Sequence, residues 1–134
     1  MDSTHPTTIL LVDDDASLRR SLARVLSAEG YRVLDAADAT EGYETFRANP
    51  DTRLVVLDLM MPPEGTPEAG AKLLERILSV RPGTKVIVAS GTGEAALALK
   101  LVKTGAYDFL QKPVDPDVLL AVLDRARVRL ALED

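Results

Sequence analysis

Four ionisable side chains in this sequence stand directly after short apolar or mixed runs. Asp13 and Asp14 follow the run ILLV, Asp58 follows LVVL, and Lys112 follows DFLQ. If these runs are neighbouring parallel strands, three carboxylates and one ammonium group meet at one edge of a sheet. Clustered carboxylates need a counter-charge, because two unit charges about 4 Å apart repel by roughly 4 kcal/mol near a protein surface. The pattern predicts a site for a divalent metal and a phosphoryl group.

The residue types favour a hard metal. Magnesium prefers oxygen ligands and is usually held by one or two carboxylates with several waters. The sequence has no cysteine and a single histidine, so softer metals lack their usual ligands. We therefore expect Mg²⁺ or Mn²⁺.

Each of these residues also has a simpler interpretation. An aspartate after a strand is more often a helix cap than a ligand, and we assign Asp15 mainly to capping. Lys112 alone would most often be a solvated surface charge, and Ser90 could be an ordinary loop residue. The combination favours the chemical interpretation, in which Lys112 neutralises phosphoryl oxygens and Ser90 donates a hydrogen bond to them.

The elements that position these residues alternate along the chain. Strands are expected at 9–12, 31–34, 54–57, 86–89 and 107–111, and a helical segment follows each of them. This alternation predicts an α/β fold of the flavodoxin-like, doubly wound type, with five parallel strands in the order 2-1-3-4-5 and five helices. Ligands of such sheets bind at the carboxyl ends of the strands, where the strand order reverses. Here that point lies between the first and third strands.

Turn and cap residues give the helix boundaries. Asp15 or a neighbour caps the first helix and Gly30 closes it, while Arg19, Arg20 and Arg24 fall on the side opposite its apolar stripe. The later helices are expected to begin at capping or turn residues, and these are Asp38 with Glu41, Thr66 with Pro67, Gly93, and Asp115 with Pro116.

The fourth and fifth helices have unusual apolar patterns. Leu97 and Leu101 point away from the face formed by the other apolar residues of the fourth helix, which are Ala95, Ala98, Leu99 and Val102. The two leucines either face a partner or widen the core stripe. The apolar stripe of the last helix continues through Leu130, which suggests a helix that runs on into an output domain or a dimer.

Length and composition define the broad class. The 134 residues correspond to one domain, with 46% apolar and 28% charged residues as in ordinary globular α/β proteins. The net charge of -5 argues against direct nucleic-acid binding. The first six residues are polar, so neither a signal peptide nor a membrane anchor is expected, and we predict a cytoplasmic protein without membrane contact.

Four short motifs together resemble the receiver (CheY-like) domain of two-component response regulators. They are Val12-Asp13-Asp14, Val56-Leu57-Asp58 with Met61-Pro62, Ala89-Ser90-Gly91 and Gln111-Lys112-Pro113. The resemblance covers essentially the whole chain. It implies that Asp58 is the phospho-acceptor and that Asp13, Asp14, Asp58 and the Met60 carbonyl hold the metal.

The resemblance also implies a switch. Ser90 would be the switch hydroxyl, Phe109 the switch aromatic, Lys112 the contact to the phosphoryl group, and the Lys112–Pro113 peptide bond would be cis. A sensor histidine kinase would phosphorylate Asp58, and the change would reach the surface of the fourth helix, fifth strand and fifth helix. Such a domain catalyses its own phosphorylation and dephosphorylation but is not a turnover enzyme. Its phosphorylation would control an output domain in cis, with transcription as the expected output, or a homodimer.

The loop at 62–70 departs from the family pattern. It is longer by about four residues if Gly70 is the glycine that opens the third helix. A similar loop is found in regulators associated with the PEP-CTERM exosortase system, in which a receiver precedes an AAA+ ATPase and a DNA-binding domain. We therefore expect a disordered segment at 1–6, a receiver domain at 7–127, and at 128–134 the end of the last helix and the start of a linker to an output domain.

Two other functions remain open from the sequence. A haloacid-dehalogenase-like phosphatase also uses an aspartate nucleophile after its first strand, which would be Asp13 here. The chain is short for that family and lacks an acidic pair after Lys112. A binding module of the same fold is the other option, either a flavin carrier or a receiver that no longer phosphorylates. The acidic loop after the first strand would repel a flavin phosphate, and every position needed for phosphorylation is filled.

Overall fold

A computed structural model describes residues 6–61 and 65–133. Within them, five strands alternate with five helices. The strands are β1 (Thr8–Val12), β2 (Arg32–Ala36), β3 (Leu54–Asp58), β4 (Lys85–Ser90) and β5 (Asp108–Gln111). The helices are α1 (Ala16–Ala28), α2 (Ala39–Ala48), α3 (Pro67–Val80), α4 (Ala95–Thr104) and α5 (Pro116–Glu133).

The strands form one parallel sheet in the order β2-β1-β3-β4-β5. The predicted fold and strand order are therefore confirmed. The central strands β1 and β3 are buried along their whole length, which explains their unbroken apolar sequences. The edge strand β2 begins one residue later than predicted and extends to Ala36, because an edge position leaves the polar Asp35 exposed.

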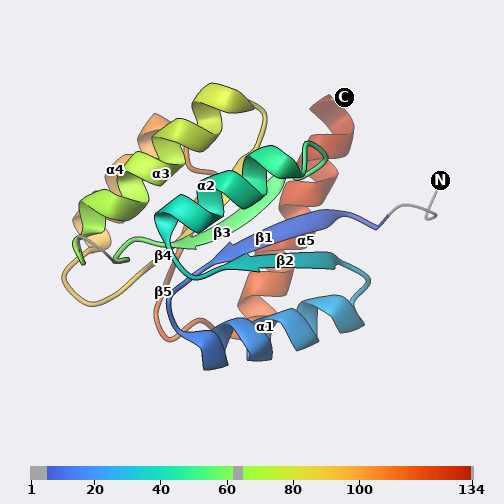
Figure 1. Ribbon diagram of the computed structural model, residues 1–134, viewed down its shortest axis with the longest axis horizontal. Helices are drawn as coiled ribbons and strands as arrows, with labels where there is room; N and C mark the ends of the chain where they lie inside the picture. Colours follow the sequence, from blue (N-terminus) through green and yellow to red (C-terminus); the bar gives the residue numbers. More distant parts are fainter. Residues whose placement is uncertain (1–5, 62–64, 134) are drawn as a thin grey trace.

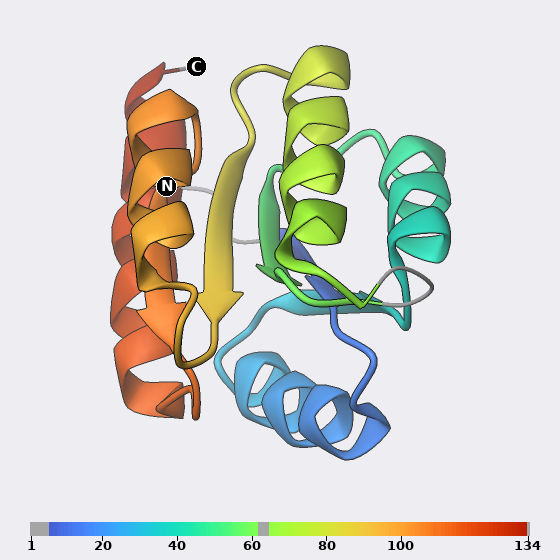
Figure 2. The same ribbon diagram turned by 90° about the vertical axis from the view of Figure 1, so that its left-hand side faces the viewer.

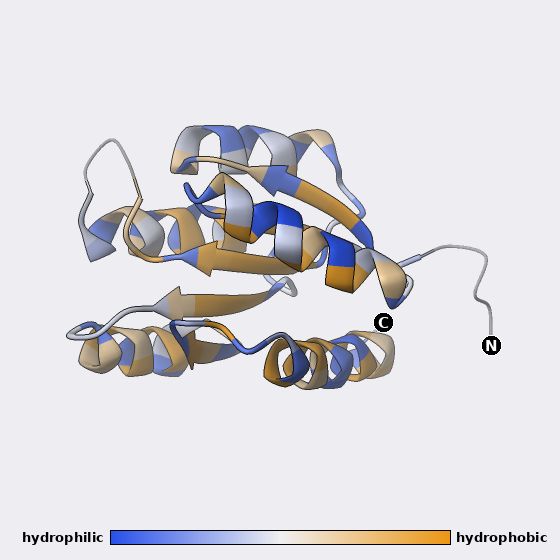
Figure 3. Cartoon of the chain, turned by 90° about the horizontal axis from the view of Figure 1, so that it is seen from below, coloured by the Kyte–Doolittle hydropathy of each residue, from blue (hydrophilic) through white to orange (hydrophobic). Residues whose placement is uncertain are grey.

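Helices cover both faces of the sheet (Figures 1 and 2). One hydrophobic cluster joins the sheet to α2, α3 and α4, with Phe46, Leu73 and Ile77 fully enclosed. A second cluster joins the other face to α1 and α5 through Leu22, Leu26 and residues of α5. Figure 3 shows strands that are mostly hydrophobic and helices that mix both characters, as expected when strands are covered on both sides.

The predicted helix caps are largely confirmed. The Asp15 side chain accepts a hydrogen bond from the Leu18 amide at 3.0 Å, and the Asp38 side chain accepts one from Glu41 at 2.8 Å. The Glu41 carboxylate accepts from the amide of Ala37, one residue before the cap, at 2.6 Å. These bonds satisfy amide groups that a helix start leaves without partners.

The predicted start of α3 is also confirmed, because Thr66 is its N-cap and Pro67 its first residue. Gly70 lies in the first turn of α3, close to the backbone of Leu59, the first residue after β3. A Cβ atom added to Gly70 would lie 2.5 Å from the Leu59 Cα. A side chain at this position would push α3 away from the strand. Residues 62–64 of the long loop lie outside the described residues.

The predicted inner face of α4 is wrong for Ala95 and Leu99, which are exposed. Of the two alternatives for Leu97 and Leu101, the structure supports the wider core stripe. Leu97 and Leu101 pack against the core, whereas Leu99, which was assigned to the inner face, is 49% exposed. Only Ala98 of the predicted inner face is fully buried, with Val102 partly buried beside it. The helix sits on the sheet rotated from the orientation that its own apolar pattern suggests.

The residues predicted for the apolar stripe of α5 are confirmed, but the stripe does not indicate a contact with an output domain or a second chain. All five residues are buried in the core of the domain itself, and they are Leu119, Val122, Leu123, Ala126 and Leu130. Leu130 is only 7% exposed, so its burial does not require an output domain or a second chain. The exposed apolar residues near the end of α5 are Val128 and Leu132.

The predicted domain boundaries at 6, 127 and 134 remain predictions. Residues 1–5 and 134 lie outside the described part, and α5 continues without a break past residue 127. No helix among the described residues is long and apolar enough to cross a membrane.

Candidate functional site

Strand register brings the predicted site residues to one edge of the sheet. Val12 of β1 pairs with Leu57 of β3, so Asp13 and Asp58 follow at the same level. Asp58 in turn pairs with Ala89 of β4, directly before Ser90. Ser90 pairs with Gln111 of β5, and the Lys112 amide donates a hydrogen bond to the Ser90 carbonyl at 2.8 Å.

The three predicted metal ligands lie together. Asp13, Asp14 and Asp58 each offer a carboxylate oxygen, and these atoms lie within 4.8 Å of one another. Asp58 is 5% exposed and Asp14 is exposed, so the cluster is closed at Asp58 and open to solvent at Asp14. An oxygen-only set with one solvent-facing side suits a cation such as Mg²⁺ that keeps part of its water shell.

Lys112 is bonded directly to this cluster. Its Nζ lies 2.9 Å from Asp58 Oδ2 and 3.4 Å from Asp13 Oδ2. The Lys112–Pro113 peptide bond is cis, as the family resemblance implied. One ammonium group therefore contacts two of the three carboxylates but can offset the charge of only one.

The Asp58 carboxyl and the Lys112 ammonium group both have altered pKa values. Burial raises the pKa of the Asp58 carboxyl, Asp13 adds to this, and the Lys112 ammonium and the Met60 amide oppose it. Burial alone would lower the pKa of Lys112, but the hydrogen bond and the charge of Asp58, together with Asp13, raise it above its usual value. Lys112 is thus charged at neutral pH, and Asp58 is a carboxylate that gains from additional positive charge.

Ser90 and Phe109 lie on the other side of the site. Ser90 is 1% exposed, and its Oγ has no hydrogen-bond partner among the described residues. Phe109 is partly buried and packs against the core cluster that contains α4. The structure therefore places a buried hydroxyl without a partner one residue beyond the position paired with Asp58.

Two residues near the site were not found from the sequence. Arg19, assigned to the outer side of its helix, has a side chain only 16% exposed and donates to the Asp13 carbonyl at 2.6 Å. Glu94 is also buried, and its carboxylate accepts a hydrogen bond from the Gly91 amide at 2.8 Å. An arginine one turn into the helix after an acidic loop was an available signal for the first. The sequence carries no comparable signal for Glu94.

The arrangement defines a class of protein. A doubly wound parallel sheet carries acidic residues after β1 and β3 and a lysine after β5, and these are the elements of a phosphate-accepting signalling domain. A model of the response regulator receiver domain family matches residues 9–124. The chain therefore belongs to the response regulator receiver domains.

Individual relatives agree with this assignment. The chain is 37% identical over 116 residues to the acid tolerance regulatory protein ActR of Rhizobium meliloti, covering 87% of this chain and 57% of ActR. It is 39% identical over 119 residues to the DNA-binding transcriptional regulator NtrC of the same organism, covering 89% of this chain and 24% of NtrC. The chain thus spans only part of the length of these regulators.

Solved structures show the same fold. A receiver domain protein from Clostridium thermocellum superposes with a TM-score of 0.89 at 29% identity, covering 96% of this chain and 99% of the other. NtrX from Brucella abortus, in complex with ADP, gives 0.86 at 33% identity, covering 96% of this chain and 29% of NtrX. These matches give no support to a haloacid-dehalogenase-like phosphatase.

Proposed function

We propose that this receiver domain accepts a phosphoryl group on Asp58 and uses the resulting change to control an output domain. The observation that carries the proposal is the meeting of three carboxylates with Lys112, which lies 2.9 Å from Asp58. Asp13, Asp14, Asp58 and the Met60 carbonyl would hold Mg²⁺ or Mn²⁺, which supplies positive charge for the transferred oxygens.

Asp58 is the nucleophile in this proposal. Its carboxylate oxygen forms a bond to phosphorus while the bond from phosphorus to the donor's histidine nitrogen breaks, and the electron pair of that bond leaves with the imidazole. Lys112 gives up its bonds to the carboxylates in favour of the incoming phosphoryl oxygens, and its charge stabilises them. Water later hydrolyses the aspartyl phosphate, so the domain returns to its starting state without acting as a turnover enzyme.

Ser90 and Phe109 are proposed to convert the modification into a change of shape. The Ser90 hydroxyl is buried with no partner in the described part of the chain, and it gains one when phosphoryl oxygens arrive on Asp58. Phe109, only partly buried, then follows the movement of Ser90 and reshapes the surface of α4, β5 and α5.

A sensor histidine kinase is the proposed donor, and the proposed output acts in transcription. Support comes from the relatives, since NtrC is described as a DNA-binding transcriptional regulator and the chain matches only 24% of its length. The part-length match supports an output domain in cis, such as an AAA+ module with a DNA-binding domain. A homodimer that forms on phosphorylation is a further part of the proposal. Direct nucleic-acid binding by this domain is not expected from its charge of -5.

The test is to incubate the protein with Mg²⁺ and acetyl phosphate, and in parallel with beryllofluoride, and to follow intact mass and oligomeric state. We expect one phosphoryl adduct on the wild type and none on Asp58→Asn. Peptide mapping locates the adduct. An adduct on Asp13, or one that persists in Asp58→Asn, would contradict the proposal.

A further inference from the structure

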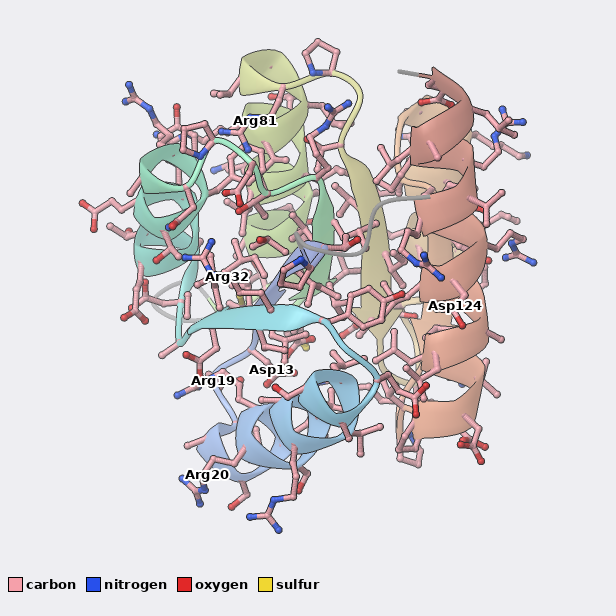
Figure 4. All side chains as sticks on the ribbon, turned by 90° about the vertical axis from the view of Figure 1, so that its right-hand side faces the viewer. Asp13, Arg19, Arg20, Arg32, Arg81 and Asp124 are labelled. Atoms are coloured by element: carbon pink, nitrogen blue, oxygen red, sulfur yellow. The ribbon has the colours of Figure 1, made fainter. Side chains whose placement is uncertain are left out.

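Arg19 connects the acidic loop to two other parts of the fold. Its side chain reaches back from the first turn of α1 and donates from one terminal nitrogen to the Asp13 carbonyl at 2.6 Å. Its Nε donates to Asp35 Oδ2, on β2, at 3.0 Å. Figure 4 shows Arg19 beside Asp13 below the sheet edge, whereas the next residue, Arg20, lies at the outer side of α1.

Every polar group of Asp13 is thereby occupied. Its amide donates to the Ala36 carbonyl at 3.1 Å, and its Oδ1 accepts from the Asp15 amide at 2.9 Å. Its Oδ2 lies 3.4 Å from Lys112 Nζ. The bond from Arg19 to the backbone carbonyl completes this set, and among the described residues it is the bond that a charged side chain makes to the backbone of Asp13. Without it, the peptide between Asp13 and Asp14 would lose its charged anchor.

The position of the guanidinium matters for a cation bound nearby. Lys112 contacts the carboxylates themselves and competes with a metal for them, but the bonds of Arg19 go to a backbone carbonyl and to Asp35. Arg19 can therefore fix the loop without occupying a ligand atom. Its positive charge would still repel a divalent cation, and Asp35 offsets that charge locally.

We propose that Arg19 is a positioning residue for the metal site, with Asp35 as its counter-ion. The proposal rests on the proposed function insofar as it takes Asp13 and Asp14 as ligands. Arg19 holds the Asp13–Asp14 peptide so that both carboxylates converge on Asp58 before a cation arrives. Outer partners that orient metal ligands typically contribute about 10- to 100-fold to metal affinity.

The experiment measures Mn²⁺ affinity by the loss of the free-ion electron paramagnetic resonance signal, and Mg²⁺ affinity by competition. We expect Arg19→Met to weaken Mn²⁺ binding about 10-fold or more, and Arg19→Lys to recover only part of it because lysine lacks the two-sided fork. Asp35→Asn should weaken binding by a smaller, salt-sensitive factor of about 2 to 5, since it leaves the charge of Arg19 without its counter-ion. Combining Arg19→Met with Asp35→Asn should cost no more than Arg19→Met alone.

Arg20→Met is the matched control, because Arg20 lies on the same helix and donates a long, exposed hydrogen bond of 3.4 Å to Ser17 Oγ. It should bind Mn²⁺ as the wild type does. Circular dichroism and melting temperature show that each variant is folded at the temperature of the titration.

Unchanged or tighter Mn²⁺ binding by folded Arg19→Met would overturn the positioning role while leaving the proposed function standing. A lower melting temperature with unchanged affinity would equally reduce Arg19 to a purely structural residue. Failure of the wild type to bind Mn²⁺ at all would overturn the metal site itself and, with it, the role of Arg19.

Discussion

The two halves of the site differ in how completely their polar groups are paired. On the β1 and β3 side, Asp13 and Asp58 are bonded to amides, to Lys112 and, through the Asp13 carbonyl, to Arg19. On the β4 side, the Ser90 hydroxyl is buried with no partner among the described residues. Buried polar groups are usually paired, and each exception calls for an explanation.

The difference indicates a division of work. The charged half is already arranged for a cation and a phosphoryl group, so little reorganisation is needed when they bind. In the half that contains Ser90, the unpaired hydroxyl destabilises the resting state. A hydrogen bond to an arriving acceptor removes this destabilisation. Glu94 belongs to this second half, because it engages the Gly91 amide next to Ser90 and leaves the hydroxyl itself free.

The largest effect is expected at Lys112, in the charged half. Lys112→Met should slow phosphorylation by acetyl phosphate about 10²- to 10³-fold, because it removes the cation that contacts Asp58 at 2.9 Å. The rate is measured by intact mass against time at saturating Mg²⁺. Lys100→Met, at an exposed position of α4, is the control and should keep the wild-type rate. Equal rates for both variants would mean that charge at this point is dispensable.

A smaller effect, with opposite signs in two measurements, is expected at Ser90. Ser90→Ala should slow phosphorylation by about 10-fold or less, since one neutral donor is lost. The same change should raise the free energy of unfolding by about 1 kcal/mol, because an unpaired buried hydroxyl disappears. Urea denaturation of the unmodified protein measures the second quantity. A clear loss of stability would show that the hydroxyl is paired in the resting state, which would remove the contrast between the halves.

The smallest effect concerns the pH dependence of stability without metal. Burial raises the pKa of Asp58 in the folded state, so its ionisation opposes folding. The penalty is absent below the ordinary pKa, where folded and unfolded chains are both protonated, and is complete above the raised pKa of the folded state. Asp58→Asn should therefore be more stable than the wild type at neutral pH, by on the order of 1 kcal/mol.

The stability difference should shrink as the pH falls through this window, and added Mg²⁺ should reduce it by stabilising only the wild type. Urea denaturation at several pH values, with a chelator or with Mg²⁺, measures both trends. A difference that does not depend on pH would mean that the charge of Asp58 is fully compensated in the resting site.

Local sequence signals predicted most of the frame. Apolar runs that end in Asp58 or Ser90 located the strands, and the caps at Asp15, Asp38 and Thr66 located the helix starts, because both depend on neighbours in the chain. The strand order then brought the acidic residues together without further information.

Facing and burial were predicted less well, because they depend on what a distant segment covers. Arg19 belongs to the polar side of its own helix, but the loop after β1 and the end of β2 fold over it. Leu99 is as hydrophobic as Leu101, yet only the packing of α4 on the sheet decides which of them is enclosed. The burial of Glu94 likewise arises from the path of the loop before α4 and not from its sequence neighbours.

The last turns of α5 set a practical limit for dividing this protein into parts. Glu133 accepts two hydrogen bonds of 2.9 Å from Lys85 Nζ, and Lys85 is the first residue of the strand whose last residue is Ser90. A chain cut at residue 127 would lose this ion pair and would uncover the apolar surface under Leu130. Fusions and truncations that aim to keep the native resting state should therefore retain α5 through Glu133. A fusion that bends α5 before Glu133 would break the contact to Lys85. It would thereby disturb β4 at the end opposite to Ser90.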